Sequence, residues 1–160
     1  MTYDSKLDTI QHIETVKEYL TRFMDGLLVR RNNHDLSKLE PPEKEAYDIL
    51  TPRLRDLTYG SEEYRACLRE MKPAIQHHYE HNSHHPEHYP GGIVDFDLLD
   101  LVEMLCDWKA ASLRHADGDI LASIEHNITR FGLEPQLASI LRNAVVRMGW
   151  VPVQDAQDGA

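Results

Sequence analysis

The sequence predicts an all-α protein, a single-domain bundle of about six to seven helices. Apolar residues recur at steps of three and four along most of the chain, which is the period of an amphipathic helix. No stretch alternates apolar and polar residues as a half-buried strand does. A length of 160 residues suits one domain with a sizeable core, and no repeat or linker divides it. We therefore expect a folded domain over residues 1–150 and a disordered tail over 151–160.

A long first helix is expected over residues 5–31, with Ser5 and Asp8 forming its capping box. His12 lies at the edge of the apolar stripe of this helix, where it either packs half-buried or points into a site between helices. Asn32-Asn33 then interrupts the helix. The stripe consists of Leu7, Ile10, Ile13, Val16, Leu20, Phe23, Met24 and Leu27.

Prolines and turn residues divide the middle of the chain. Pro41-Pro42 opens a helix over residues 43–50, and Pro52 ends it or begins another short piece. The next helix is expected over residues 62–81, because Ser61 is a good N-cap. Within this helix Pro73 predicts a kink or a restart. The remaining stretch before the next helix, residues 82–92, is rich in Pro and Gly and is expected to be an ordered loop.

The most apolar helix is expected over residues 97–116, and it should be central because its apolar residues go nearly all the way round. Asp100, Glu103 and Asp107 follow one another at steps of three and four, on one stripe of this helix. A buried carboxylate must be paired or bound to metal, since an isolated buried charge is very costly. We favour a metal-ligand role for Asp107, and for Glu103 a ligand role and an ordinary salt bridge both stay open.

Two last helices are expected over residues 118–131 and 134–148, with Gly132 as the stop signal between them. Cys67 and Cys106 lie in helical segments and are predicted to be small buried hydrophobic residues. Two such cysteines predict no disulfide framework, so a reducing compartment fits.

The chain is acidic, with a formal net charge of −10. This charge argues against extended nucleic-acid binding, which needs a basic surface. The chain starts without the apolar run of a signal peptide, and no apolar run approaches the length of a membrane span. We expect a cytoplasmic protein without a membrane partner.

The dipeptide His34-Asp35 is the feature around which we expect a site to form. A ring nitrogen and a carboxylate can bind one divalent ion if the backbone between them turns. An Asp that caps a short turn, with a surface His beside it, explains the same dipeptide equally well. The histidines that follow favour the metal site, because six of the ten fall within twelve residues. These six are His77, His78, His81, His84, His85 and His88.

The order His12, His34-Asp35 and Asp107 resembles the HD superfamily of metal-dependent phosphohydrolases, all-α proteins whose ligands follow in the order His, His-Asp, Asp. The stretch from His34 to Lys38 is similar to the His-Asp-x-Gly-Lys element of several HD subfamilies, with Ser37 in place of Gly. The block His81–Tyr89 resembles the His-rich middle segment of members with two metal ions. The whole arrangement also resembles an uncharacterised group of small HD-like proteins common in phage and bacterial genomes.

This resemblance implies a divalent transition metal (Mn, Fe, Co, Ni or Zn) held by His12, His34, Asp35 and Asp107. A bound cation of this kind lowers the pKa of a water molecule from ~15.7 toward ~7. Whether a second ion binds stays open. The candidates for its ligands are His81 and one of His84 or His85.

The resemblance also implies catalytic roles. Asp35 is expected to orient the water, and Lys38 to contact a phosphate or remain a solvated surface residue. His77 or His78 is expected to hold the substrate phosphate. The proton donor to the leaving oxygen is expected to be a His or Glu of residues 77–88, with His77, His78, His81 and Glu87 as candidates. For Glu87, a place behind the metal ligands and plain exposure to solvent stay open as well.

The function implied is hydrolysis of a small phosphorylated molecule, with a nucleotide as the leading candidate. Phosphomonoesterase, nucleotidase and phosphodiesterase activities all stay open. One alternative is a di-iron oxygenase of HD type. The other is a non-catalytic interaction protein that metal stabilises. Self-association stays open as well.

Overall fold

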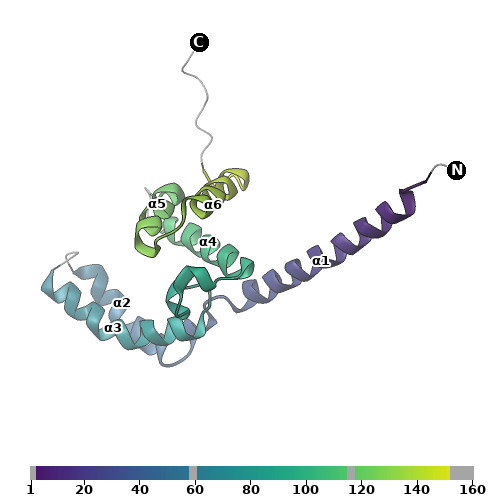
Figure 1. Cartoon of the computed structure of the whole chain (residues 1–160). Coiled ribbons are helices and arrows are strands. Elements are labelled where there is room, and N and C mark those ends of the chain that lie inside the picture. The colour runs from purple at the N-terminus through teal and green to yellow at the C-terminus, as the bar shows by residue number, and fades with distance from the viewer. Residues whose placement is uncertain (1–2, 58–60, 115–117, 152–160) are drawn as a thin grey trace, which may run out of the picture.

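Six α-helices and three short 3₁₀ turns are present in the residues that the structure describes, which are 3–57, 61–114 and 118–151. The structure is a computed structural model, shown as a ribbon in Figure 1. In chain order the elements are α1 (Lys6–Asn33), η1 (Leu36–Leu39), α2 (Glu43–Asp56), α3 (Glu62–His81), η2 (Pro86–His88), η3 (Gly92–Asp95), α4 (Leu98–Ser112), α5 (Ile120–Phe131) and α6 (Pro135–Arg147). The prediction of an all-α single domain is confirmed. From residue 152 onward the predicted tail lies outside the described residues.

Two apolar cores hold the helices together. The helices α2 and α3 pack as a pair around a small core made by Leu50, Cys67 and Met71. A larger core lies among α4, α5 and α6. Its buried residues are Met104, Leu105, Trp108, Ile120, Ile124, Leu133, Leu141 and Val145. Figure 1 shows the two groups of helices on either side of the segment that carries η2 and η3, which is also where α1 ends. The candidate site residues therefore gather at the junction of the two cores.

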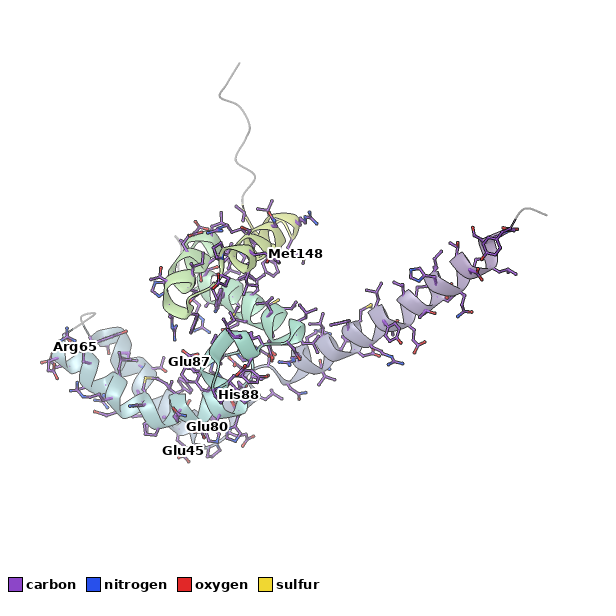
Figure 2. The ribbon with its side chains drawn as sticks, in the orientation of Figure 1. Glu45, Arg65, Glu80, Glu87, His88 and Met148 are labelled. Carbon is purple, nitrogen blue, oxygen red and sulfur yellow. The ribbon has the colours of Figure 1, made fainter. Side chains whose placement is uncertain are left out.

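The first helix projects from the rest of the molecule. Its N-terminal half extends away from the other helices, and its side chains spread on all sides (Figures 1 and 2). No residue of α1 is buried. Its C-terminal half packs against α4, and Gly26 allows a close approach there. A Cβ atom at Gly26 would lie 2.8 Å from Cδ1 of Leu99. The predicted apolar stripe exists, but most of it faces solvent.

The expected break at Pro52 and the expected restart at Pro73 are wrong, whereas a kink at Pro73 stays a prediction. The helix α2 continues through Pro52 to Asp56 instead of ending at Leu50. Leu54, beyond the proline, packs against the smaller core, and this contact offsets the lost backbone hydrogen bond. The helix α3 likewise continues through Pro73 as one helix.

The predicted helix caps have mixed outcomes. The Ser61 side chain accepts a hydrogen bond from the Tyr64 backbone N–H, so this N-cap is confirmed. Gly132 ends α5 with a φ of 64°, the left-handed conformation that glycine adopts readily. The capping box of Ser5 and Asp8 is wrong, because the Ser5 side chain makes no cap hydrogen bond.

The two cysteines differ in exposure. Cys67 is buried in the smaller core, as predicted, whereas Cys106 is exposed. The prediction for Cys106 is wrong because it lies on a face of α4 that α5 and α6 do not cover. Both thiols are free. Within the described residues, no helix is both long and apolar enough to cross a membrane.

Arg30 ties the end of α1 to α4. One guanidinium nitrogen, Nη1, donates to Asp100 Oδ1 at 2.5 Å and to Glu103 Oε2 at 3.0 Å. Asp100 is 1% exposed and also accepts hydrogen bonds from Ser83 and from the Tyr89 hydroxyl. Burial opposes ionisation of Asp100, but these donors outweigh it and hold the pKa of the carboxyl below its ordinary value. This buried ion pair fixes the end of α1 where the site begins.

Replacing Asp100 by Ala should lower the free energy of unfolding by about 2 kcal/mol or more, because buried donors lose their acceptor. Arg30 then keeps only Glu103 as a buried carboxylate partner, and the hydroxyls of Ser83 and Tyr89 lose the carboxylate to which they donate. Urea denaturation followed by circular dichroism measures the loss. Asp25→Ala is the matched control, since Asp25 is exposed on α1 and such changes stay within about 0.5 kcal/mol. A loss at Asp100 no larger than the loss at Asp25 would contradict the anchoring role.

Candidate metal centre

The site begins at a backbone turn between α1 and η1. Asp35 has φ 58° and ψ 14°, in the left-handed region, and it is the one non-glycine residue with positive φ among the described residues. Asp tolerates this conformation better than most residues, at a cost of roughly 1 kcal/mol. The turn brings the side chains of His34 and Asp35 to neighbouring positions, with His34 Nε2 at 3.7 Å from Asp35 Oδ2. The backbone turn that a shared metal site requires is therefore present.

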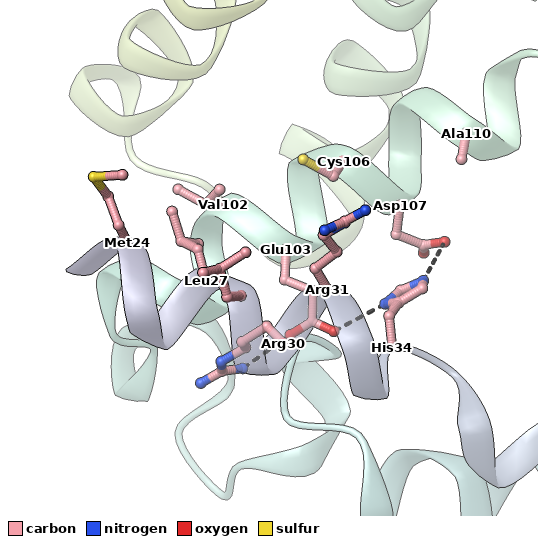
Figure 3. A pocket seen from close by; sticks show the side chains of 11 residues that line it. Met24, Leu27, Arg30, Arg31, His34, Val102, Glu103, Cys106, Asp107 and Ala110 are labelled. Carbon is pink, nitrogen blue, oxygen red and sulfur yellow. Dashed lines mark hydrogen bonds and ion pairs between the residues drawn. The ribbon is translucent and has the colours of Figure 1, made fainter. Parts of the chain in front are cut away.

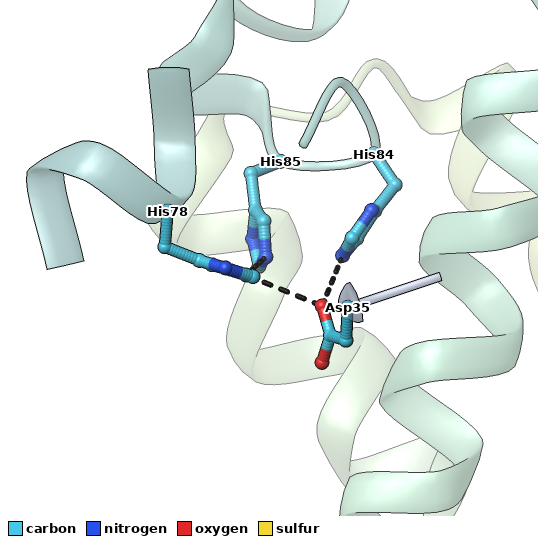
Figure 4. Close-up of side chains that lie close together, drawn as sticks. All are labelled: Asp35, His78, His84 and His85. Carbon is cyan, nitrogen blue, oxygen red and sulfur yellow. Dashed lines mark hydrogen bonds and ion pairs between the residues drawn. The ribbon is translucent and has the colours of Figure 1, made fainter. Parts of the chain in front are cut away.

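Three histidines converge on the Asp35 carboxylate (Figure 4). Asp35 Oδ1 lies 3.3 Å from His78 Nε2 and 3.6 Å from His84 Nε2. His85 Nε2 lies 2.9 Å from His78 Nε2. One donor atom from each of the four residues falls within 4.8 Å of the others, so the structure holds a His/Asp cluster that could bind a metal ion.

Two atoms at the centre of this cluster are buried without a hydrogen-bond partner among the described residues. They are Asp35 Oδ1 and His84 Nε2. Buried polar atoms nearly always have a partner, because an unsatisfied one costs about 1–3 kcal/mol. A cation between the carboxylate oxygen and the ring nitrogen would satisfy both atoms at once.

A second group of possible ligands shares Asp35 and lies on the side toward α4. His34 Nε2 is 3.8 Å from Asp107 Oδ1 and 3.7 Å from Asp35 Oδ2. One donor atom from each of these three residues also lies within 4.8 Å of the others. Asp35 Oδ1 faces His78 and His84, whereas Asp35 Oδ2 faces His34.

Two acidic residues hold the outer nitrogens of the histidine rings. Glu43 is fully buried, and its two oxygens accept from Nδ1 of His77 and of His78 at 2.8 and 2.9 Å. Glu103 Oε1 lies 2.8 Å from His34 Nδ1 and 3.3 Å from His84 Nδ1. Carboxylates that bind the far nitrogen in this way orient metal-ligating histidines and leave Nε2 free for the metal.

Two carboxylates of the centre, Asp35 and Glu103, are held ionised. Burial opposes ionisation of Asp35, but contacts with His78 and Lys38 outweigh it and keep the pKa of this carboxyl well below its usual range. The pKa of Glu103 is lowered in the same way, by His34, His84 and Arg30 against the effect of burial. The bond to Glu103 is in turn the main reason that the pKa of His34 is raised.

The His85 ring, in contrast to these carboxylates, is held in its uncharged form. Burial, together with the neighbouring His84, His78 and Lys38, lowers the pKa of His85 to about 3. The ring therefore stays neutral at pH 7, which is the state that binds metal.

The structure brings together five of the seven predicted metal ligands: His34, Asp35, His84, His85 and Asp107. Both His84 and His85 lie in the cluster, where we expected one of the two. His78, which we expected to hold phosphate, points its Nε2 at Asp35 and is a fourth member of the cluster around that carboxylate.

The expectation that His12 binds the metal together with His34 and Asp35 of the same chain is wrong. His12 is exposed on the projecting half of α1. It precedes His34 by 22 residues, which along a helix corresponds to about 33 Å. The edge of an apolar stripe predicted a site between helices, but no other described helix covers that part of α1 (Figure 1).

The placement of His81 is also wrong. His81 is the last residue of α3, and its Nδ1 bonds to the His77 carbonyl oxygen at 2.8 Å. Its ring stacks on the His77 ring at 3.9 Å between centroids, outside the cluster. Four-residue spacing does place His77 and His81 on one face of the helix, but His78 is on the face that points at Asp35. His85 follows the helix end and reaches the site from the loop.

Of the expected catalytic residues Lys38 and Glu87, only Lys38 contacts Asp35. Lys38 Nζ contacts Asp35 Oδ2 at 2.5 Å, so it is at the centre as expected. Glu87 on η2 instead pairs with Arg130 of α5 at 2.7 Å (Figure 2 labels Glu87). This ion pair removes Glu87 as the expected proton donor.

Glu43 is the main site residue that sequence reasoning missed. It lies in the first turn of α2, where an acidic residue is ordinary because it favours the helix dipole. Neither its spacing nor its neighbours distinguish it from a surface acid. Only the packing of α2 on α3 shows that it is buried against two histidines.

A groove of about 650 Å³ borders the centre on the side of His34 and Asp107 (Figure 3). It runs between the C-terminal half of α1 and α4, and most of its surface is apolar. The residues that line it are Met24, Leu27, Leu28, Arg30, Arg31, His34, Val102, Glu103, Cys106, Asp107 and Ala110.

Comparison with known proteins gives one family. Residues 1–147 match the model of the Family of unknown function (DUF5662). No curated protein and no solved structure matches the chain.

Metal-free protein should lose stability between pH 6.5 and 5 partly because of His85. The unfolded chain takes up a proton on this ring near pH 6.5, whereas the folded chain does so only near pH 3. Stability from this residue is therefore lost as pH falls through that window. His85→Gln should reduce the loss by about 1 kcal/mol, measured by urea denaturation with a chelator present.

The matched control is His126→Gln, an exposed histidine on α5. It should leave the pH dependence as in the wild type. If the free energy of unfolding fell equally with pH in the wild type and in His85→Gln, the His85 ring would not be buried in its neutral form.

Proposed function

The chain belongs to the Family of unknown function (DUF5662), and from the chemistry of its centre we propose that it is a metal-dependent phosphohydrolase acting on a small phosphorylated molecule. The observation that supports this most is the pair of buried, unpartnered atoms, Asp35 Oδ1 and His84 Nε2, among further histidine nitrogens. Such an enzyme needs a metal ion, an open side through which substrate reaches the metal, and a cation that binds the phosphate.

The donor set fits a divalent transition metal. Imidazole nitrogens together with carboxylate oxygens suit Zn, Fe, Mn, Co or Ni, whereas Mg and Ca prefer oxygen alone. Asp35, His78, His84 and His85 would hold one ion, and His34, Asp35 and Asp107 a second. Asp35 would then contribute to both sets of ligands, because its two oxygens face different groups.

The second group has an open side, as a catalytic metal requires. The side chains of His34, Asp35 and Asp107 are 31%, 20% and 23% exposed, whereas His78 and His84 are 3% and 2% exposed. A purely structural metal site is normally closed by four protein ligands. Solvent and substrate would therefore reach the centre from the side of His34, where the groove lies.

The chemistry follows from these parts. A bound divalent cation lowers the pKa of a water molecule and neutralises phosphate oxygens. Asp35, whose carboxyl is held ionised, would bind the metal and orient the bound water. Lys38 would exchange its contact with Asp35 for a phosphate oxygen, adding positive charge where charge develops. His81 and Glu87 take no part, and no proton donor to the leaving group is assigned.

The likeness to the HD superfamily supports a nucleotide as the leading candidate substrate. The ligand order His34-Asp35 and Asp107 matches that likeness, and His12 departs from it. A histidine-rich pair of sites also suits the di-iron oxygenase alternative, because imidazole and carboxylate bind iron well. The test must therefore separate hydrolysis from consumption of dioxygen.

Metal analysis after reconstitution with Mn, Fe, Co, Ni or Zn tests the ligand assignment. Asp35→Ala should lose most of the metal, because it contributes to both groups. Asp107→Ala should lose only the ion on the side of the groove. Glu43→Gln should weaken metal affinity by about 10- to 100-fold through loss of the carboxylate behind His78.

His81→Ala is the matched control, since His81 lies beside these histidines in sequence but outside the cluster. It should keep the metal content of the wild type. Equal metal content in the wild type, Asp35→Ala and His81→Ala would refute the centre.

Activity is tested with p-nitrophenyl phosphate, bis-p-nitrophenyl phosphate and a panel of nucleotides, with each metal in turn. Lys38→Ala should lower kcat/KM by about 100-fold at unchanged metal content. Turnover that needs two irons and consumes dioxygen would replace the hydrolase by the oxygenase. If the protein binds its full complement of metal, melts at a higher temperature than the metal-free protein and turns over no substrate, the metal has a structural role and the hydrolase proposal is wrong.

A further inference from the structure

A continuous apolar face of α1 is exposed along almost the whole helix. Leu20 is 58% exposed and Met24 is 62% exposed, although both belong to an amphipathic stripe that normally faces a core. The exposed members of this face are Leu7, Ile10, Ile13, Val16, Leu20, Met24 and Leu28. They follow one another at steps of three and four, so they lie on one side of the helix.

A helix in this position needs a partner. Most of the stability of a helix in a protein comes from packing its apolar face, and propensity alone gives a marginal helix in water. The N-terminal half of α1 has no such packing against the residues that the structure describes (Figures 1 and 2). A contiguous exposed apolar surface of this extent is typical of an interaction site.

The same face leads directly into the groove beside the metal centre. Met24 and Leu28 belong both to the exposed face and to the lining of the groove. Across the groove, α4 presents Val102 and Cys106, which are also exposed (Figure 3). One chain thus carries an apolar ridge, the N-terminal half of α1, and an apolar groove, the C-terminal half of α1 with α4.

We propose that a second copy of this chain covers this face, with the two α1 helices antiparallel and the N-terminal half of each in the groove of the other. A two-fold axis near the middle of α1 uses the same surface on both copies, as a symmetric dimer does. The apolar ridge of each copy then packs in the apolar groove of the other, and the whole exposed apolar face of α1 is buried.

Charge favours the antiparallel direction. The first half of α1, residues 6–19, carries three acidic and two basic residues. The second half, residues 20–33, carries three basic residues and one acidic residue. Antiparallel pairing sets the acidic half against the basic half and also opposes the two helix dipoles. Exposed Arg31, at the groove, would face the first turns of the partner helix, which include Asp8.

A membrane surface is a poorer occupant. Helices that lie on membranes are rich in Lys and Arg on the polar face. The polar residues of α1 are instead mixed, with five basic and four acidic residues, and the whole chain carries −10. A small molecule is also a poorer occupant, because the exposed face continues well beyond the groove toward Leu7.

The dimer would complete the surroundings of the metal centre. The groove borders His34 and Asp107, so the partner's helix would form one wall of the entrance to the site. The entrance would then be built from two copies of the chain, independently of which reaction the metal supports.

The first test is the oligomeric state in solution, measured by light scattering and analytical ultracentrifugation on the full chain. The wild type should be a dimer. Ile13→Glu places a charge in the interface of both copies and should weaken the dimer by about a hundredfold or more. Gln11→Glu is the matched control, since it adds the same side chain to the exposed surface of α1 off the apolar face, and it should remain a dimer.

The second test is a cross-link that only one arrangement permits. Ile10→Cys introduces a thiol that lies about 27 Å along the helix from Leu28, which lines the groove with Cys106. A short bismaleimide therefore cannot join it to Cys106 of the same chain. In the antiparallel dimer it should join it to Cys106 of the partner subunit and give covalent dimers. Cys67 is buried and should not react.

Adding Cys106→Ser to Ile10→Cys should abolish the cross-link. The two introduced thiols would lie about 28 Å apart in the antiparallel pair, too far to join directly. Covalent dimers that persist in the double variant would show a parallel pair and overturn the proposal. A monomeric wild type without cross-links would overturn it too, whatever binds the groove instead.

Discussion

The structure around the centre depends on the carboxylate of Asp35 and on the left-handed turn that positions it. One oxygen of this carboxylate faces the nitrogens of His78 and His84, and the other faces His34 and Lys38. The backbone cost of the turn is roughly 1 kcal/mol, which is small beside the interactions of an ionised carboxylate in this position. Asp35 therefore lies in the turn that follows the first helix and is shared by two groups of possible metal ligands.

The centre is built where two groups of helices meet, and buried acids hold its histidines from both sides. Glu43 comes from the helix pair α2–α3, and Glu103 comes from α4, which belongs to the larger core. Arg30 links Glu103 and Asp100 to the end of α1. Because each buried charge has a partner on a different element, the relative position of the two cores and the geometry of the site constrain each other. Among the described residues, this arrangement leaves His84 Nε2 and Asp35 Oδ1 buried without a hydrogen-bond partner.

The exposed face of α1 and the open side of the centre belong to the same region. The groove between α1 and α4 joins them, and its apolar lining ends at His34 and Asp107. A symmetric pairing of two α1 helices would bury the apolar face and shape the approach to the centre. The metal and its chemistry would be set by one chain, whereas access to them would be set by two.

The sequence by itself determined the all-α fold and most helix positions, and it predicted His34, Asp35, Asp107 and one of His84 and His85 among the possible ligands that the structure brings together. Local signals suffice for these, because helical periodicity, helix caps and adjacent ligands depend on residues that are close together in the sequence. Only the tertiary structure decided that His78 enters the centre while His81 and His12 do not. One step along α3 turns a side chain about 100°, and which face is inward depends on where α2 and the Asp35 turn pack. The same reason hid Glu43, whose burial arises from contacts between helices, and left the stripe of α1 facing solvent.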